Sequence, residues 1–191
     1  MEMNKWYKRI AFMAVFLFFC LPIYEVNSGD RELAQKTVES LTSQLRSENV
    51  LVRMTSALEL GGLKDTSSAK TLVFSLNDSD SLVRASSALA LGEIQGPSAI
   101  MPLIARQSDP DRWVRSSVAI ALGEMNNQGA VNPLISMLTD KHWSVRRFAA
   151  ISLGKLKAQQ ALKPLIEKST DPDQSVSEAI ASAIAEIKKE T

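Results

Sequence analysis

Apolar positions recur along this chain at a fixed interval of 31 residues from Ser47 onward. Four series of identical or similar residues stay in phase with no insertion or deletion between units. They are Val52, Val83, Val114, Val145, Val176; Ala57, Ala88, Ala119, Ala150, Ala181; Leu60, Leu91, Leu122, Leu153, Ile184; and Gly61, Gly92, Gly123, Gly154. A period of roughly 20 to 50 residues is typical of solenoids, so the repetition predicts a stack of similar units.

Each unit is predicted to hold two helices. In the unit that begins at Asp109, the residues Val114, Val118, Leu122 and Met125 follow one another at spacings of three or four, which is one apolar face of a helix. Asp109 is a suitable N-cap, and the proline after it suits the first helical position, where its missing N–H has no partner to lose.

The second predicted helix of the same unit carries Val131, Leu134, Ile135 and Leu138 on one face. A proline recurs early in this helix at Pro102, Pro133 and Pro164, a position where proline is tolerated. The recurring glycines lie near the end of the first helix. They either let neighbouring backbones approach closely or let the chain turn, and the sequence leaves both interpretations open.

A single pair of helices cannot bury both of its faces, so most of the stability is expected at the interfaces between units. The predicted fold class is all-α, a right-handed α-solenoid of stacked antiparallel helix pairs. The expected boundaries are a capping helix over residues 30–46, repeats over 47–77, 78–108, 109–139 and 140–170, and a terminal helix over 171–191. Residues 29–191 form the repeat domain, and residues 1–28 are a separate segment.

Two charged series accompany the apolar ones, and the whole pattern is D-x-D-x-x-V-R-x-x-A-x-x-A-L-G followed by x-P-L-I. This pattern resembles the short HEAT-like repeats named after phycocyanobilin lyases, over residues ~47–191. The resemblance implies an armadillo-like fold with a hydrogen-bonded ladder of Asp and Arg between adjacent units. The residues that match it are Asp78, Asp109, Asp140, Asp171, Arg53, Arg84, Arg115 and Arg146.

The first 28 residues have the layout of a secretory signal peptide. Lys5, Lys8 and Arg9 precede an apolar run from Ile10 to Leu21, and a polar stretch follows it. Val26 and Ser28 are small enough to precede a cut before Gly29. Two alternatives stay open: an uncleaved membrane anchor, and a lipoprotein acylated on Cys20. The first choice predicts export, to the bacterial periplasm or cell envelope.

Charge and composition narrow the range of functions. Removal of residues 1–28 takes away three of the 22 basic residues and two of the 21 acidic ones, which leaves 19 of each. A neutral body gives no reason to expect nucleic acid as a partner, and a membrane partner is expected only through an uncleaved N-terminal segment. The only cysteine, Cys20, and the only histidine, His142, are too few for a Cys and His metal site.

Enzymes exist on this architecture, and two types are considered. HEAT-like deoxyhypusine hydroxylases hold iron with repeated His-Glu pairs, and this sequence has no His-Glu dipeptide. Bilin lyases are closer in pattern but suit an exported protein poorly. His142 takes the position held by Asp80 and Asp111 in other units and is expected on the surface. We therefore predict no catalytic, cofactor-binding or metal-binding residue, with an enzyme or enzyme subunit of these two types as the alternative.

Departures from the repeat mark the candidate site. Aromatic and basic residues gather at the starts of the first helices of the third and fourth units: Arg112, Trp113, His142, Trp143 and Arg147. Tryptophan and arginine are enriched among residues that dominate binding energy. We predict that these residues bind another protein and that the chain is an exported scaffold rather than an enzyme. The alternative is that a tryptophan folds over a neighbouring helix as part of the core.

Overall fold

The computed structural model describes residues 28–189. The predicted signal segment therefore lies outside the described residues except for Ser28, where the first described helix begins. The chain divides into two compact units, residues 1–37 and 38–191. In the first unit the described residues are the start of helix α2 (Ser28–Gln44), where Lys36 and Glu32 form an exposed ion pair.

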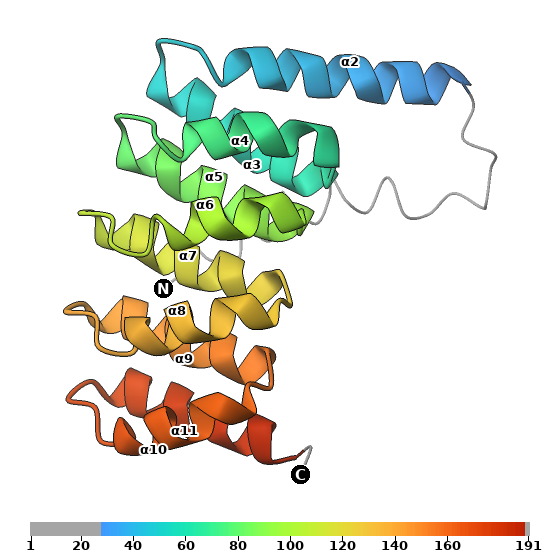
Figure 1. Cartoon of the computed structure of the whole chain (residues 1–191). Helices are drawn as coiled ribbons and strands as arrows, with labels where there is room; N and C mark the ends of the chain where they lie inside the picture. Colours follow the sequence, from blue (N-terminus) through green and yellow to red (C-terminus); the bar gives the residue numbers. More distant parts are fainter. Residues whose placement is uncertain (1–27, 190–191) are drawn as a thin grey trace, which may run out of the picture. The chain divides into compact units, whose positions relative to one another are not determined.

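The second unit holds the rest of α2 and alternating long and short helices (Figure 1). The long first helices of the repeats are α3 (Val50–Leu63), α5 (Ser81–Ile94), α7 (Arg112–Glu124), α9 (Trp143–Lys155) and α11 (Gln174–Lys188). The short second helices are α4 (Ala69–Ser75), α6 (Ile100–Ile104), α8 (Val131–Met137) and α10 (Leu162–Glu167). One turn of 3-10 helix leads into each second helix: Thr66–Ser68, Pro97–Ala99, Gln128–Ala130 and Gln159–Ala161. The predicted fold class, an all-α solenoid of stacked helix pairs, is confirmed.

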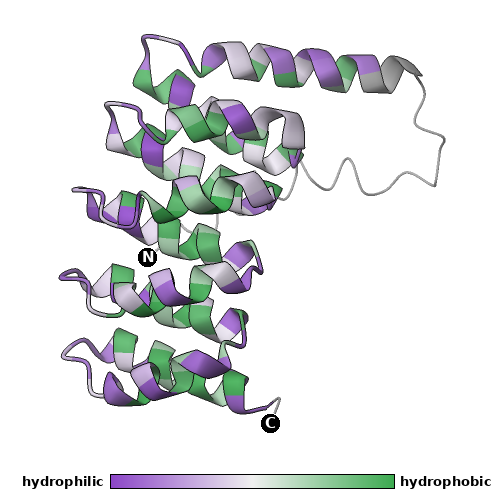
Figure 2. Ribbon diagram, viewed as in Figure 1, coloured by the Kyte–Doolittle hydropathy of each residue, from purple (hydrophilic) through white to green (hydrophobic). Residues whose placement is uncertain are grey.

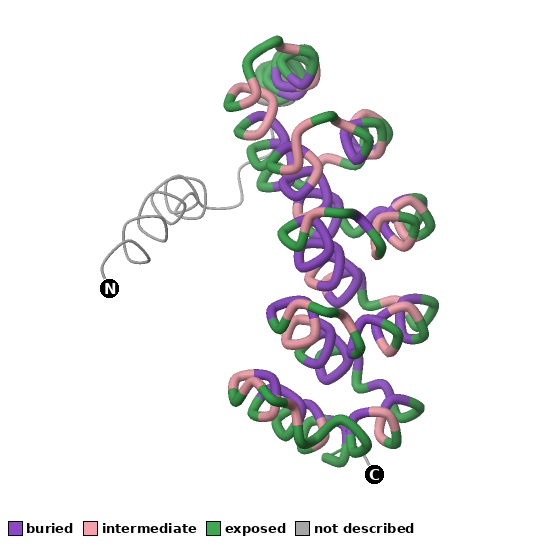
Figure 3. The backbone as a smooth tube through the Cα atoms, turned by 90° about the vertical axis from the view of Figure 1, so that its left-hand side faces the viewer, coloured by how far each residue is buried: buried purple, intermediate pink, exposed green. Residues whose placement is uncertain are grey.

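The first helices and the second helices form two columns. Burial is concentrated in the first-helix column, where α5 and α7 contain many fully enclosed side chains (Figure 3). The repeating valine, alanine and leucine series supply them: Val114, Ala119 and Leu122 are all 0% exposed. Hydrophilic residues lie in the loops, and hydrophobic residues lie along the helices (Figure 2). The 31-residue series is thus the core itself, as the apolar spacing predicts.

The recurring glycines serve close approach rather than turning. A Cβ on Gly61 would lie 2.6 Å from Cα of Ala90 in the next first helix, and one on Gly92 would lie 2.7 Å from Cα of Ala121. Gly123 and Gly154 meet Ser152 and Ala183 in the same way. None of the described glycines has a positive φ. Adjacent first helices therefore touch backbone to backbone at each of these positions.

The turn after each first helix is made by a different residue. Lys64, Gln95, Asn126 and Lys157 adopt the left-handed conformation with φ between 46° and 56°, and they are themselves 31 residues apart. The backbone N–H of Lys64 reaches back to the carbonyl of Gly61, and that of Gln95 to the carbonyl of Leu91. This closes the helix end, a task usually given to glycine or asparagine.

The edge of the stack at these turns is tied by single amide hydrogen bonds. The side-chain Nε2 of Gln95 donates to the carbonyl of Glu124 at 2.6 Å, and that of Gln159 donates to the carbonyl of Ile187 at 3.0 Å. A longer bond of 3.4 Å joins Gln128 to the carbonyl of Leu156. Each bond links one repeat to the next through one neutral donor.

Candidate functional site

The opposite edge of the stack, which we call the ladder edge, is formed by the loops that precede the first helices: residues 47–49, 78–80, 109–111, 140–142 and 171–173. Each loop is closed by a pair of side chains two residues apart. Asp109 Oδ1 accepts the N–H of Asp111 at 3.0 Å, and Asp111 Oδ1 accepts the N–H of Trp113 at 2.7 Å.

The second aspartate of this motif is therefore the helix cap. Asp111 precedes α7 as its N-cap, while Asp109 and Pro110 lie outside the helix. The prediction that Asp109 caps the helix is wrong by two residues. Both aspartates offer acceptors, but the first is drawn away by an arginine of the previous repeat.

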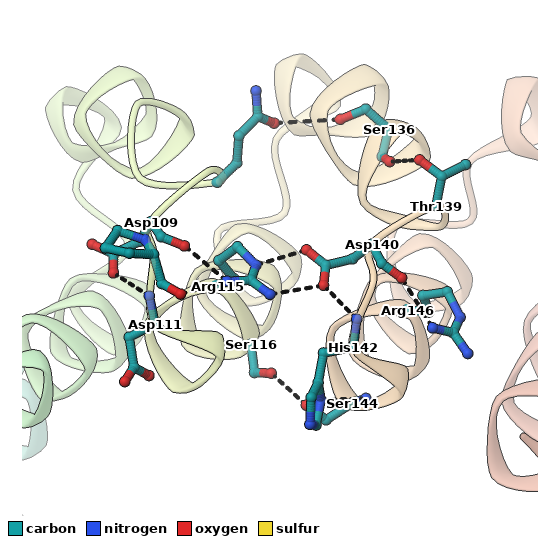
Figure 4. A network of polar contacts seen from close by, with 12 residues as sticks. Asp109, Asp111, Arg115, Ser116, Ser136, Thr139, Asp140, His142, Ser144 and Arg146 are labelled. Atoms are coloured by element: carbon teal, nitrogen blue, oxygen red, sulfur yellow. Dashed lines mark hydrogen bonds and ion pairs between the residues drawn. The ribbon is translucent and has the colours of Figure 1, made fainter.

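That arginine belongs to the ladder that the family resemblance implies (Figure 4). Arg115 Nε and Nη2 donate to the two carboxylate oxygens of Asp140 at 2.7 and 2.9 Å. The remaining nitrogen, Nη1, donates to the carbonyl oxygens of Asp109 at 2.8 Å and Pro110 at 3.2 Å. One guanidinium group thus joins the loop before its own helix to the loop before the next helix.

The same rung recurs in every repeat interface that has both residues. The four paired rungs are Arg53 with Asp78, Arg84 with Asp109, Arg115 with Asp140 and Arg146 with Asp171. The series stops at Ser177, which takes the arginine position and donates only to the carbonyl of Asp171 at 3.2 Å. The ladder residues therefore act on the scaffold, and their side chains are committed to one another.

Burial and pairing oppose each other at these carboxylates. Burial would raise the pKa of Asp109 and Asp140, but the hydrogen bonds from Arg84 and Arg115 and from backbone N–H groups outweigh it and hold both values below the ordinary range. At Asp171 the hydrogen bond from Arg146 is the largest influence, and the pKa is again lowered. These aspartates are ionised at neutral pH and serve as fixed acceptors.

The two tryptophans of the candidate site lie on the ladder edge, at the starts of α7 and α9. Trp113 is 57% exposed and Trp143 is 45% exposed, so neither is a core residue. The Arg112 guanidinium lies 5.3 Å from the centroid of the Trp113 ring, while the Arg147 guanidinium lies over Phe148 rather than over a tryptophan. The alternative in which a tryptophan packs into the core is excluded by these exposures.

His142 occupies the N-cap position of α9, which confirms its predicted equivalence to Asp80 and Asp111. Its Nδ1 accepts the N–H of Ser144 at 3.2 Å and shares a 2.8 Å hydrogen bond with the Ser144 hydroxyl. The ring also stacks on Trp143, with 5.7 Å between centroids. His142 is only partly exposed, because its ring has become part of the cap.

A pocket of about 570 Å³ opens between the loops before α7 and α9. Its lining contains three of the five predicted residues, Arg112, Trp113 and His142, together with Pro110, Asp111, Arg115 and Lys141. Trp143 and Arg147 do not line it. The structure thus brings part of the predicted group together around one concavity and leaves the rest beside it.

Sequence reasoning missed two features of this surface. Lys141 lines the pocket, although it stands at an ordinary loop position of the repeat. Leu51 and Leu82, the equivalents of Trp113 in the first two repeats, are 60% and 47% exposed. Their shared register in the sequence was the available signal that an exposed apolar position runs along the whole edge.

Two further searches covered the described residues. Among residues 28–189 no group of three or more His, Cys, Asp or Glu side chains is placed to hold a metal ion. In the same range no helix combines the length and the apolar character that a membrane crossing requires.

Comparison with known proteins adds a family and a set of structural relatives. A family model described as HEAT repeats matches residues 38–122 and 100–185. Comparison with curated protein sequences gives no match. Among solved structures, the complex of CpcE and CpcF of phycocyanin lyase from Nostoc sp. PCC7120 matches with a TM-score of 0.72 and 22% identity, covering 88% of this chain and 70% of that chain.

Two engineered proteins give similar matches. A designed armadillo repeat protein in complex with the peptide (KR)4 has a TM-score of 0.58 and 17% identity, and the match covers 82% of this chain and 86% of that chain. Another engineered protein has a TM-score of 0.60 and 22% identity, with 80% and 79% coverage. At these identities the likeness concerns the fold.

Proposed function

The chain belongs to the HEAT-repeat family, and on that premise we propose that it is a non-catalytic scaffold that holds another protein along the ladder edge. One observation carries the proposal: adjacent first helices, α7 and α9, each present a half-exposed tryptophan beside exposed cations. Isolated exposed apolar residues are ordinary on protein surfaces, but aromatic residues paired with arginine are enriched at the centres of interfaces.

The available energy suits such a role. The exposed fractions of Trp113 and Trp143 together amount to about one whole tryptophan side chain. Covering roughly 200 Å² of aromatic surface would contribute about 5 kcal/mol before the losses that association imposes. This is the size of contribution that a small group of central residues makes in a protein interface.

Two relatives of the fold support binding as its use. CpcE and CpcF form a complex with each other, and the designed armadillo protein binds a peptide. The absence of catalysis is part of the proposal and rests on how the polar groups are occupied. The recurring arginines and aspartates pair with one another, and the His142 Nδ1 is engaged by Ser144. The competing proposal of an enzyme is tested by assays with added iron or bilin.

Export to the periplasm or cell envelope also belongs to the proposal and rests on residues 1–28 of the sequence. The mass of the mature protein tests it: a chain that begins at Gly29 supports a cleaved signal, and an intact N-terminus in the membrane fraction supports an anchor. Acylated Cys20 would indicate a lipoprotein.

The binding role is tested by capture of partners from the envelope fraction with the double variant Trp113→Ala and Trp143→Ala. Both side chains are exposed, so helical content by circular dichroism should stay unchanged while capture falls. The matched control is Phe74→Ala with Ile166→Ala, which removes apolar side chains 68% and 52% exposed in the second-helix column. Equal capture by both double variants would rule out the ladder edge as the binding surface.

A further inference from the structure

The exposed apolar residues of the ladder edge form one continuous series, which we call the edge stripe: Leu51, Leu82, Trp113 and Trp143. Each stands at the first or second position of successive first helices, α3, α5, α7 and α9. Their exposed fractions are 60%, 47%, 57% and 45%. The stripe thus offers one apolar side chain per repeat over four repeats.

Positive charge is confined to one end of this stripe. Arg112, Lys141 and Arg147 belong to the third and fourth repeats, and none of them forms an ion pair with a described residue. The equivalents of Arg112 in the first two repeats are Val50 and Ser81, which carry no charge.

One carboxylate, that of Asp111, also lines the pocket. Its Oδ1 is engaged by the N–H of Trp113, so it acts as a helix cap there. Three cations without ionic partners therefore face one acid that is already hydrogen-bonded. The surface is basic and aromatic at α7 and α9, and apolar and uncharged at α3 and α5.

From this arrangement we propose that the partner is an extended protein segment with acidic residues at one end and large apolar residues three positions apart. The inference rests on the proposed scaffold function and names the chemistry of its partner. The acidic end lies at the pocket between α7 and α9, and the apolar residues cover the stripe toward α3. Complementary charge would fix the direction in which the segment lies.

The spacing follows from the geometry of packed helices. Neighbouring helices lie about 8 to 10 Å apart, which sets the distance from one stripe residue to the next. A polyproline II segment advances about 9 Å in three residues and returns a side chain to the same side each time. Every third side chain of such a segment would therefore meet one repeat.

A nucleic acid is the other polyanion to consider. Its phosphates repeat along the whole strand, so a binding surface would need cations beside several repeats. Here the α3 and α5 end offers leucines instead. The observations favour a segment that is acidic at one end only.

The test is selection from a displayed library of random peptides on the full chain, followed by affinity measurement of the enriched peptides. We expect peptides that pair terminal Asp or Glu with large apolar residues at every third position. The double variant Arg112→Glu with Lys141→Glu should weaken them about tenfold or more, because two attractions become repulsions. The control Lys70→Glu with Lys163→Glu makes the same charge change on exposed lysines of the second-helix column and should leave affinity unchanged.

The outcomes separate two failures. Enriched peptides that lose binding in the double tryptophan variant but are neutral or basic, or that tolerate the charge reversal, would overturn the acidic partner and leave the scaffold function standing. If no peptide depends on the two tryptophans, the proposed function itself fails at this edge. A single-stranded oligonucleotide that outcompetes the peptides and is lost on charge reversal would also overturn the inference.

Discussion

Two neighbouring glycines at the end of α3 provide a sharp test of how the repeats are packed. Gly61 and Gly62 share the same helix and both have negative φ, so alanine at either site gains about 0.5–1 kcal/mol of helix stability. Their surroundings differ completely. A Cβ on Gly62 meets nothing within 4 Å, whereas a Cβ on Gly61 would lie 2.6 Å from Cα and 2.9 Å from Cβ of Ala90.

An ordinary contact requires 3.4 to 4 Å, so α3 and α5 must separate by about 0.8 Å or more to admit a methyl group at Gly61. The opposing atoms belong to the backbone and Cβ of a buried helix and cannot rotate away. Overpacking of this kind costs about 1–3 kcal/mol, which outweighs the gain in helix propensity. We expect Gly61→Ala to destabilise the protein by about 1 kcal/mol or more and Gly62→Ala to stabilise it by about 0.5 kcal/mol.

Urea unfolding followed by circular dichroism measures both free energies, and thermal unfolding gives a second estimate. For a chain of this size 1 kcal/mol corresponds to a shift of about 2–4 °C in Tm, so the two variants should move Tm in opposite directions. If Gly61→Ala is as stable as Gly62→Ala, then the first helices are not held in backbone contact and the account of the glycine series is refuted.

Three further predictions concern the ladder edge. Removing one partner of a buried rung, as in Arg115→Leu or Asp140→Leu, should lower the free energy of unfolding by about 3 kcal/mol, while the double variant should recover part of the loss; equal effects in all three would contradict a coupled pair. Because the pKa values of the ladder aspartates are lowered in the folded state, their contribution is complete above about pH 4 and is lost as the pH falls through the lowered values, so stability measured against pH should fall less steeply below pH 4 in the double variant than in the wild type. Replacing the cap of α9 by the residue used in other repeats, His142→Asp, should add about 0.5 kcal/mol in urea unfolding and weaken any acidic ligand of the pocket; a loss of stability would show that stacking on Trp143 matters more than the cap.

The sequence predicted the architecture because the same residues both repeat and form the core. Val114, Ala119 and Leu122 are conspicuous in the sequence through their period and are fully buried in the structure. A 31-residue period without insertions leaves little freedom in how the units stack. The paired Asp and Arg series came from the family resemblance, and the bidentate geometry at Arg115 and Asp140 agrees with it.

Local details were harder to predict where several residues have the same chemical ability. Asp109 and Asp111 can both cap a helix, and only the reach of Arg84 from the previous repeat assigns them different tasks. The left-handed turn residues were not anticipated, since Lys64 and Gln95 have no intrinsic preference for positive φ. Their conformation is imposed by the packing of the first and second helices that they join.

The site was predictable in membership but not in arrangement. Trp113 and Arg112 stand out from the repeat in sequence, yet their exposure depends on which side of the helix the N-cap leaves them. Arg147 was grouped with the tryptophans, but its guanidinium lies over Phe148. Sequence register alone does not give the side-chain direction that decides such contacts.

The two edges of the stack differ in how firmly they join successive repeats, and this has a mechanical consequence. Two-pronged ionic clasps hold the ladder edge, whereas lone neutral amides hold the other edge. Under load the array opens like a fan, with the ladder edge as its pivot and the far edge taking most of the strain. The pocket and the edge stripe lie beside that pivot, so the array can flex to follow a partner while the surface that grips it keeps its shape.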